Sequence, residues 1–283
     1  AEGEGMGRGM TRRGLGVAAR NAVVGLTVAR FASGTPRPSL ASPATQVTNA
    51  NGRAYSAYVP VVPKFGQFYQ YTCEFDAAWI ILATYGVEAP FEELLDIVGH
   101  DVSIEPYYEE TAAGFIIYGG DITSAFSGDY ANNLLARASG KAFQPLFEQF
   151  DLAVKPIGTR PELESALQSG ALVWTKATVD FQPWADTIWI TPSGAELPTV
   201  LGNDHAVVIN GYNEDVVVIS DPLGPTSSNW NRAFEYEIPW ATFLPVWGAQ
   251  NQDALAVSPF SVIPSTSPSI DPTAPIIEIT GGA

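Results

Sequence analysis

The chain of 283 residues has very few of the side chains from which disulfides and metal sites are built. It contains one cysteine, Cys73, and two histidines, His100 and His205. A single cysteine excludes an intrachain disulfide and a cysteine-based metal site, and two histidines exclude a multi-histidine site. No uninterrupted apolar run reaches the roughly 18 residues that span a bilayer. We therefore expect no cofactor and no transmembrane segment.

Lysine and arginine are also scarce, with 14 of them against 30 aspartates and glutamates, for a net charge of −16. The imbalance is uneven, because residues 1–46 carry six arginines against Glu2 and Glu4. The remainder of the chain is therefore strongly acidic. Such a body repels the phosphates of nucleic acids, so we do not expect nucleic acid as a partner.

Composition divides the chain into three parts. Residues 1–46 are rich in Gly, Ala and Arg, and two interpretations remain open for them. Thr11 to Leu15, with its paired arginines, resembles a twin-arginine export signal, which predicts an extracellular or cell-surface protein; the alternative is a basic N-terminal arm, compatible with the cytoplasm. Residues 47–257 have the composition of one domain. Residues 258–283 are rich in Pro, Ser and Thr, which indicates a C-terminal tail.

The stretch around Cys73 predicts an extended segment that runs into a helix. Thr72 can serve as the N-cap, Cys73 stands in the first turn, and Gly86 can end the helix in a left-handed conformation. A thiol at this position faces unpaired N–H groups and the positive end of the helix dipole, both of which favour the thiolate. Cys73 is therefore a candidate nucleophile. The alternative is a small apolar residue of the core.

Periodicity and turn residues outline the rest of the domain. Residues 100–128 predict an irregular acidic connection, and residues 180–202 an insertion that could form a hairpin. Helices come first and antiparallel strands later, so we expect an α+β fold with the N-terminal helices in one layer on an antiparallel sheet. The patterns predict helices at 91–98, 129–139, 142–149 and 161–169, and a short helix or turn at 240–247. They predict strands at 152–156, 171–179, 205–209, 216–220 and 234–238.

His205 opens one of two neighbouring strands and Asp221 follows the other. If these strands pair antiparallel, their far ends meet, and the two side chains come within hydrogen-bond reach. The carboxylate would then fix the imidazole tautomer, and packing the Cys73 helix on this sheet would add a nucleophile to the base. Taken singly, a surface histidine and a turn-starting Asp-Pro are the alternatives. His100 lacks such a setting and is expected in a loop.

Acyl transfer also needs donors for the developing oxyanion. The backbone N–H of Cys73 is one candidate donor. A side-chain amide shortly before the cysteine is the usual second, and both Gln67 and Gln70 qualify. Either glutamine could instead be a solvated polar residue.

Together these motifs resemble the papain-like cysteine peptidases related to bacteriocin-processing, double-glycine leader peptidases, in their stand-alone C39-like form. The resemblance implies a papain-like fold with Cys73, His205 and Asp221 as the catalytic triad. It also favours Gln67 over Gln70, because the family's glutamine stands six positions before its cysteine. The similarity covers roughly residues 58–248, and its motifs are Gln67…Cys73, Ala77-Ala78…Tyr85-Gly86, residues 166–173, His205-Ala206-Val207-Val208…Gly211-Tyr212 and Asp221-Pro222.

One departure from the family pattern is Glu74, which stands where the family usually has glycine and could crowd the cleft or raise the thiol pKa. The other is the length of the insertions 100–128 and 180–202, which could shape or cover a substrate cleft. Two functions therefore remain open. The first is a cysteine peptidase acting on a peptide or protein substrate. The second is a catalytically inactive, peptidase-like binding or surface-structural module, with self-association or a surface partner engaged through the tails or the insertions. A weaker third idea is self-processing at the Gly281-Gly282 pair.

Overall fold

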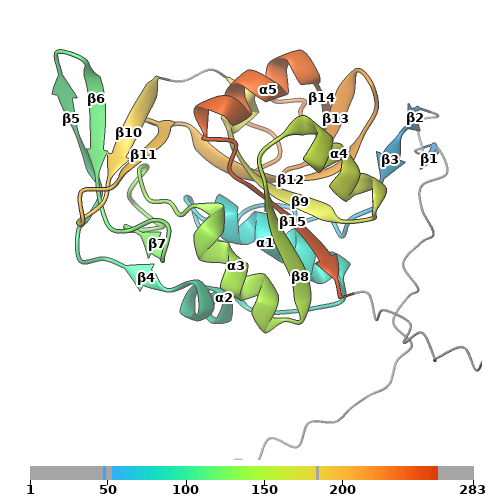
Figure 1. The fold of residues 1–283 in the computed structure, drawn as a ribbon, viewed down its shortest axis with the longest axis horizontal. Helices are drawn as coiled ribbons and strands as arrows, with labels where there is room; N and C mark the ends of the chain where they lie inside the picture. Colours follow the sequence, from blue (N-terminus) through green and yellow to red (C-terminus); the bar gives the residue numbers. More distant parts are fainter. Residues whose placement is uncertain (1–46, 49–52, 183–184, 261–283) are drawn as a thin grey trace, which may run out of the picture. The chain divides into compact units, whose positions relative to one another are not determined.

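The computed structural model describes residues 47–48, 53–182 and 185–260 (Figure 1). The expectations for the N-terminal arm or signal at 1–46, and for the double glycine, concern residues outside these ranges. Among the described residues, no helix combines the length and the apolar sequence that crossing a membrane requires.

The largest sheet has the strand order β14-β13-β12-β9-β15-β8, with β3 also paired to β12. Every pairing in it is antiparallel, as predicted. Both β9 and β12 are buried along almost their whole length, as expected for central strands that are apolar on both faces. The sequence analysis missed β15. The bounds are β3 Ala57–Tyr58, β8 Leu152–Ile157, β9 Leu172–Thr178, β12 Asp204–Tyr212, β13 Val216–Ser220, β14 Glu235–Pro239 and β15 Ala254–Pro259.

Helices cover both faces of this central sheet (Figure 1). Ala206 and Val208 of β12 pack in one hydrophobic core with α1, α2 and α3, whereas Val207 and Ile209 pack in a second core with α4 and α5. The α+β class is confirmed, but the expectation of a single helical layer is wrong, because strands that are apolar on both faces need a cover on each. The helices are α1 Cys73–Thr84, α2 Phe91–Val98, α3 Gly140–Gln149, α4 Arg160–Gln168 and α5 Trp240–Ala249.

Helix ends follow the glycine signals. Gly86 after α1 has φ +80° and Gly99 after α2 has φ +83°, a region in which side chains with a Cβ are strained. Thr72 stands at the N-cap of α1, as predicted, but its hydroxyl donates to Asp76 Oδ2 at 2.7 Å instead of capping the helix. The helix predicted over 129–139 is absent. The Asp129 carboxylate there accepts backbone N–H groups two and three residues ahead, which favours turns over a helix.

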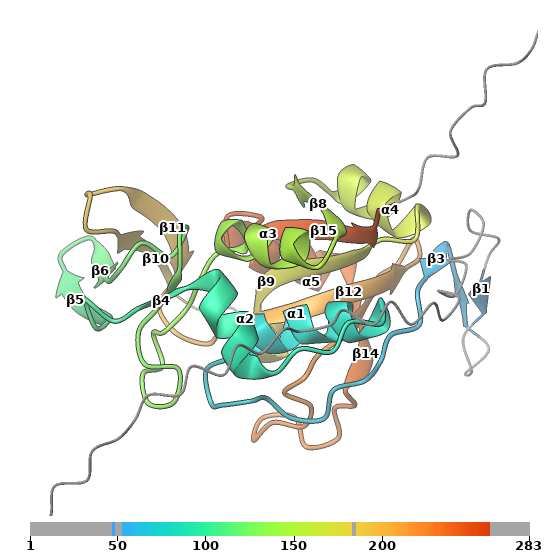
Figure 2. The same ribbon diagram turned by 90° about the horizontal axis from the view of Figure 1, so that it is seen from below.

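The two insertions form a sheet of their own, which we call the accessory sheet. Its strand order is β11-β10-β6-β5, so segments about 70 residues apart in sequence lie side by side (Figure 2). The hairpin in 180–202 is confirmed, whereas the expectation that 100–128 is irregular is wrong. The strands are β5 Tyr107–Thr111, β6 Gly114–Tyr118, β10 Asp186–Ile190 and β11 Glu196–Val200; the short strands elsewhere are β1 Val47–Thr48, β2 Ala54–Tyr55, β4 His100–Asp101 and β7 Phe126–Ser127.

Arg137 fastens the accessory sheet to the rest of the domain. Its side chain is 1% exposed. Nη1 donates to Thr199 Oγ1 at 2.8 Å and to the Val200 carbonyl at 2.9 Å, and Nε donates to the Leu135 carbonyl at 3.0 Å. These bonds satisfy carbonyls at the end of β11 that would otherwise be buried without partners.

We expect Arg137→Met to destabilise the protein by about 3 kcal/mol, because it leaves buried acceptors without donors. Equilibrium urea unfolding measures the change, and hydrogen exchange should show the largest loss of protection within 186–200. Lys155→Met is the matched control, since it removes one positive charge at an exposed position and should change the stability by less than about 1 kcal/mol. Equal effects of the two substitutions would contradict the anchoring role of Arg137.

Candidate active site

His205 and Asp221 lie next to each other, as the strand arrangement predicted. His205 Nε2 is 2.9 Å from Asp221 Oδ1, and both side chains are almost completely buried. Asp221 Oδ2 accepts a hydrogen bond from the Tyr236 hydroxyl at 2.9 Å and lies 3.2 Å from Arg232 Nη1. The geometric expectation for this pair is confirmed, whereas its catalytic role stays a prediction.

Electrostatics keep Asp221 ionised. Burial alone would raise the pKa of its carboxyl, but His205, Arg232 and the hydrogen bonds to the carboxylate outweigh burial and lower the pKa. An ionised Asp221 accepts the proton of His205 Nε2, which leaves Nδ1 as the basic nitrogen of the neutral ring. Among the described residues, Nδ1 has no hydrogen-bond partner. His205 is therefore held in an orientation that suits a general base.

Cys73 is the first residue of α1, as predicted, and its side chain is 6% exposed. Its thiol donates to Glu74 Oε2 at 3.2 Å, and no hydrogen bond joins it to His205 in the described part of the chain. By strand alternation, His205 shares a side of β12 with Val207, whereas α1 packs against the side of Ala206. The structure thus brings together His205 and Asp221 of the predicted triad, whereas Cys73 bonds to Glu74.

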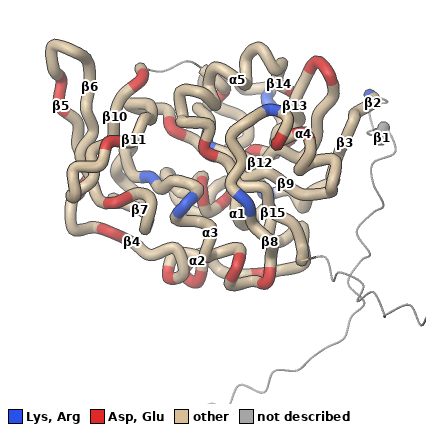
Figure 3. Tube along the Cα trace, viewed as in Figure 1, with Lys and Arg blue, Asp and Glu red and all other residues tan. Residues whose placement is uncertain are grey.

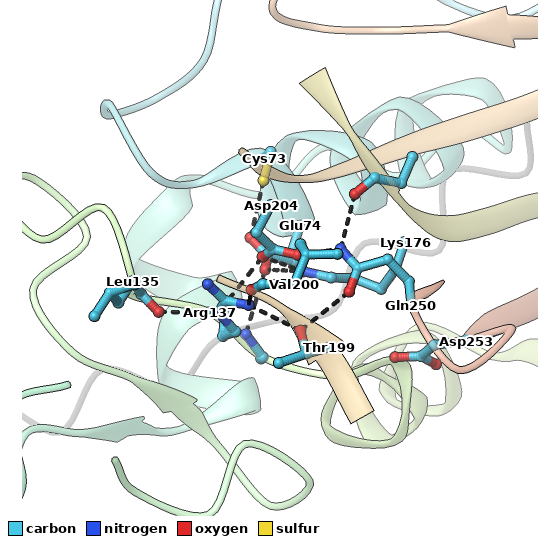
Figure 4. Close-up of polar contacts among 12 residues, drawn as sticks. Cys73, Glu74, Leu135, Arg137, Lys176, Thr199, Val200, Asp204, Gln250 and Asp253 are labelled. Carbon is cyan, nitrogen blue, oxygen red and sulfur yellow. Dashed lines mark hydrogen bonds and ion pairs between the residues drawn. The ribbon is translucent and has the colours of Figure 1, made fainter. Parts of the chain in front are cut away.

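Glu74 turns away from the surface and into the layer between α1 and the sheet. Its Oε1 accepts from Lys176 Nζ at 2.6 Å, and the same ammonium lies 2.6 Å from Asp204 Oδ2 (Figure 4). Glu74 is fully buried, so its carboxylate is not exposed at the surface. The first consequence expected from this departure, a crowded cleft, stays a prediction.

The second expected consequence, a raised thiol pKa, is what the structure shows. Burial raises the pKa of Cys73 well above its ordinary value, and the negative charge of Glu74 raises it further, while Lys176 opposes both. The helix N-terminus alone predicted the opposite shift. That prediction is wrong for this conformation, because loss of solvent and an adjacent carboxylate outweigh a partial dipole charge.

A buried polar cluster continues from Lys176 to the accessory sheet. Asp204 Oδ1 accepts from Gln250 Nε2 at 2.6 Å, and Gln250 Oε1 accepts from the Thr199 hydroxyl at 3.1 Å. Asp204 stays ionised despite burial, since Lys176 and Arg137 lower its pKa. The sequence analysis missed this cluster. A lysine inside the mostly apolar segment 171–179 was the available signal, because a buried ammonium requires a carboxylate partner.

Hydrogen bonds connect the loop that carries Gln67 to the segment after Asp221 and to helix α1. The N–H of Gly66 donates to the Pro222 carbonyl at 2.9 Å, next to Asp221. On the other side, Asp76 Oδ1 accepts from the Phe68 N–H and pairs with Lys64 Nζ, both at 3.0 Å. Gln67 is half-buried, and its amide has no hydrogen-bond partner among the described residues.

The remaining candidates have structural partners. Gln70 is exposed, and its amide donates to the Tyr71 hydroxyl at 3.1 Å. His100 lies in β4 and bonds the Gly128 carbonyl at 2.8 Å through Nε2. The described residues contain no cluster of His, Cys, Asp and Glu suited to a metal ion.

A cavity of about 470 Å³ lies at the junction of the central and accessory sheets, with Arg137, Lys176, Gln250 and Asp253 in its lining. None of the four predicted site residues lines it. Its lining thus includes members of the buried polar cluster, Lys176, Thr199 and Gln250.

The raised pKa of Asp76 predicts that the free energy of unfolding depends on pH. Burial raises its pKa to about 6, although Lys64 and the hydrogen bonds lower it. The folded protein therefore binds a proton that the unfolded chain releases near pH 4, so this residue's contribution to the free energy of unfolding falls as the pH rises from about 4 to 7. The loss is on the order of 2–3 kcal/mol. Urea unfolding at several pH values should show a flatter profile for Asp76→Asn, and an unchanged profile would contradict this prediction.

Glu74→Gln should lower the pKa of Cys73, because it removes the adjacent negative charge while Lys176 remains. The rate of iodoacetamide labelling against pH measures this shift, and the wild-type midpoint should lie above about 8.5. Glu88→Gln, at an exposed position just beyond α1, is the control and should leave the midpoint unchanged. The double variant Glu74→Gln, Lys176→Met should bring the midpoint back up. A wild-type midpoint below the ordinary value would contradict the bond to Glu74.

Comparison with known proteins adds three findings. The model of the peptidase C39-like family matches residues 58–255. The uncharacterized protein YvpB of Bacillus subtilis (strain 168) is 26% identical over 162 residues, which cover 52% of this chain and 61% of that protein. A crystal structure described as a C39-like peptidase from Bacillus anthracis has a TM-score of 0.56 and 18% identity, and the match covers 72% of this chain and 98% of that one. The chain thus spans less than two thirds of the curated relative, and the solved structure shows a shared fold.

Proposed function

Because the chain belongs to the peptidase C39-like family, which confirms both the resemblance and the papain-like fold, we propose that it is a cysteine peptidase. Cys73 is the nucleophile in this proposal, His205 the general base and then the acid, and Asp221 the group that orients the imidazole. Gln67 and the backbone N–H of Cys73 are the oxyanion donors. The substrate is a peptide or protein, and the reaction needs no cofactor.

The observation that carries this proposal is the His205–Asp221 pair. Asp221 holds the Nε2 proton, so the free Nδ1 can take the proton of the thiol. The thiolate then attacks the peptide carbonyl, and the imidazolium returns the proton to the leaving amine. Water, deprotonated by the same nitrogen, releases the acyl group from sulfur.

The proposal requires Cys73 to exchange partners. In the conformation described, Glu74 accepts the thiol hydrogen bond and the raised pKa keeps the sulfur protonated at neutral pH. Cys73 begins α1 and His205 is the second residue of β12, so both stand at the ends of their elements. We infer that activity begins when the thiol leaves Glu74 for His205 Nδ1.

Hydrolysis of fluorescent casein by the full chain, with a reducing agent present, tests the proposal. We expect Cys73→Ala to abolish cleavage and Gln67→Ala to lower kcat about 10²-fold, the typical loss for one oxyanion donor. Gln70→Ala is the matched control and should stay within twofold of wild type. Cleavage that survives in Cys73→Ala, or equal losses for the two glutamines, would contradict the assignment.

A second candidate function is a catalytically inactive, peptidase-like binding module. The bond between the Cys73 thiol and Glu74 favours it, because a protonated sulfur held away from the imidazole is a poor nucleophile. Glu74→Gly, the substitution that restores the family's usual residue, separates the two functions. A latent peptidase should gain casein cleavage and faster labelling, whereas a module without a competent cleft should gain labelling alone.

A further inference from the structure

The accessory sheet presents one covered face and one open face. Ile117 and Trp189 are fully buried on the inner face, where they pack with Ile122 and Leu135. Residues that pair across strands share a face, so the register defines the opposite, outer face. The exposed and half-buried residues of the outer face include Tyr107, Glu109, Ile116, Tyr118, Asp186, Ile188, Ile190, Glu196 and Pro198, whereas Val200, which pairs with Asp186, is buried at one end of it.

Apolar side chains occupy the middle of the outer face. Ile116, Ile188 and Ile190 come from the two central strands, and Ile188 is 37% exposed. Tyr107, 48% exposed, stacks on Tyr118 with ring centroids 5.3 Å apart. No described element covers this face, whereas helices cover both faces of the central sheet. The outer face therefore lacks the layer that a sheet with apolar side chains normally acquires.

Carboxylates flank these apolar side chains on both sides. Glu109 lies on β5 and Glu196 on β11, the two edge strands of the accessory sheet, and both are exposed. Neither insertion contains a lysine or an arginine, as the absence of blue from this sheet in Figure 3 shows. The acidic residues of the insertions 100–128 and 180–202 are Asp101, Glu105, Glu109, Glu110, Asp121, Asp180, Asp186 and Glu196.

We propose that the outer face of the accessory sheet docks a basic amphipathic helix of a partner protein. An apolar stripe on the helix would cover the isoleucines and tyrosines, and lysines or arginines beside the stripe would reach Glu109 on one side and Glu196 on the other. Strands of five residues are about 16 Å long, which matches roughly eleven residues of helix.

Charge decides between this occupant and others. A second copy docked through the same face would bring the same unpaired carboxylates against one another, and an anionic membrane surface or a nucleic acid would be repelled. A simple counterion would leave the apolar side chains exposed. A cationic, amphipathic segment satisfies both features of the face.

The probe is a fluorescein-labelled 14-residue peptide with leucines at helical spacing and lysines elsewhere, titrated into the full chain at 0.1 M salt and followed by polarisation. We expect saturable binding, with much weaker binding of a peptide in which glutamates replace the lysines. Peptide binding should also protect residues 107–118 and 186–200 from hydrogen exchange. No difference between the two peptides would overturn the proposal.

Matched variants locate the binding face. Glu109→Gln combined with Glu196→Gln should weaken binding about three- to tenfold, the effect of losing two surface ion pairs. Glu92→Gln combined with Glu93→Gln removes the same charge from the exposed side of α2 and should change affinity less than twofold. Equal losses would mean diffuse attraction to an acidic body and would overturn the assignment.

Ile188→Ser tests the apolar part of the face, at an exposed position where folding should be preserved. We expect at least a fivefold loss of affinity with an unchanged near-ultraviolet circular dichroism spectrum. Unaltered affinity would show that the isoleucines make no contact and would overturn the proposal. A wild-type dimer in sedimentation that Ile188→Ser converts to a monomer would also overturn it, since the face would then bind a second copy.

Discussion

The ion pair between Glu74 and Lys176 joins the first turn of α1 to a central strand of the sheet, and the geometry of the candidate site depends on it. Two charges that are buried together lose their free energy of hydration. The close contact at 2.6 Å and the second carboxylate, on Asp204, compensate for this loss. This requirement fixes the side chain of Glu74 in one orientation. One of its oxygens faces the ammonium, so the other is left to receive the thiol of Cys73.

Because the Glu74–Lys176 pair is buried, the position of the Glu74 carboxylate affects the protonation of the neighbouring Cys73 thiol. Glutamate in place of the family's usual glycine adds a carboxylate next to Cys73, and Lys176 holds this carboxylate in the buried layer between α1 and the sheet. The same carboxylate raises the pKa of the thiol. His205 and Asp221 are arranged for base catalysis independently of this, since their bond lies on the other side of β12. The pKa of the thiol and the orientation of the imidazole are thus set by different residues, Glu74 and Asp221.

Local rules were sufficient for much of the fold, including helix ends at Gly86 and Gly99 and the approach of His205 to Asp221 through an antiparallel hairpin. They failed where a distant partner decides the outcome. The hairpin of residues 107–118 becomes part of a larger sheet because β10, about 70 residues away in the sequence, pairs parallel with β6. No local sequence pattern predicts that pairing. Likewise, the position of Cys73 at a helix N-terminus was predictable, but the direction of its pKa shift depended on Glu74 and on burial.

Arg137 shows how the insertions and the site form one structure. It binds the end of β11 and lies 3.9 Å from Asp204, which in turn holds Lys176. Buried groups thus connect the accessory sheet to the residues that keep Glu74 in place. Moving one buried charge changes the pKa of the buried groups next to it. The residues that anchor the accessory sheet and the charges that act on the Cys73 thiol, those of Glu74, Lys176 and Asp204, therefore belong to one buried network.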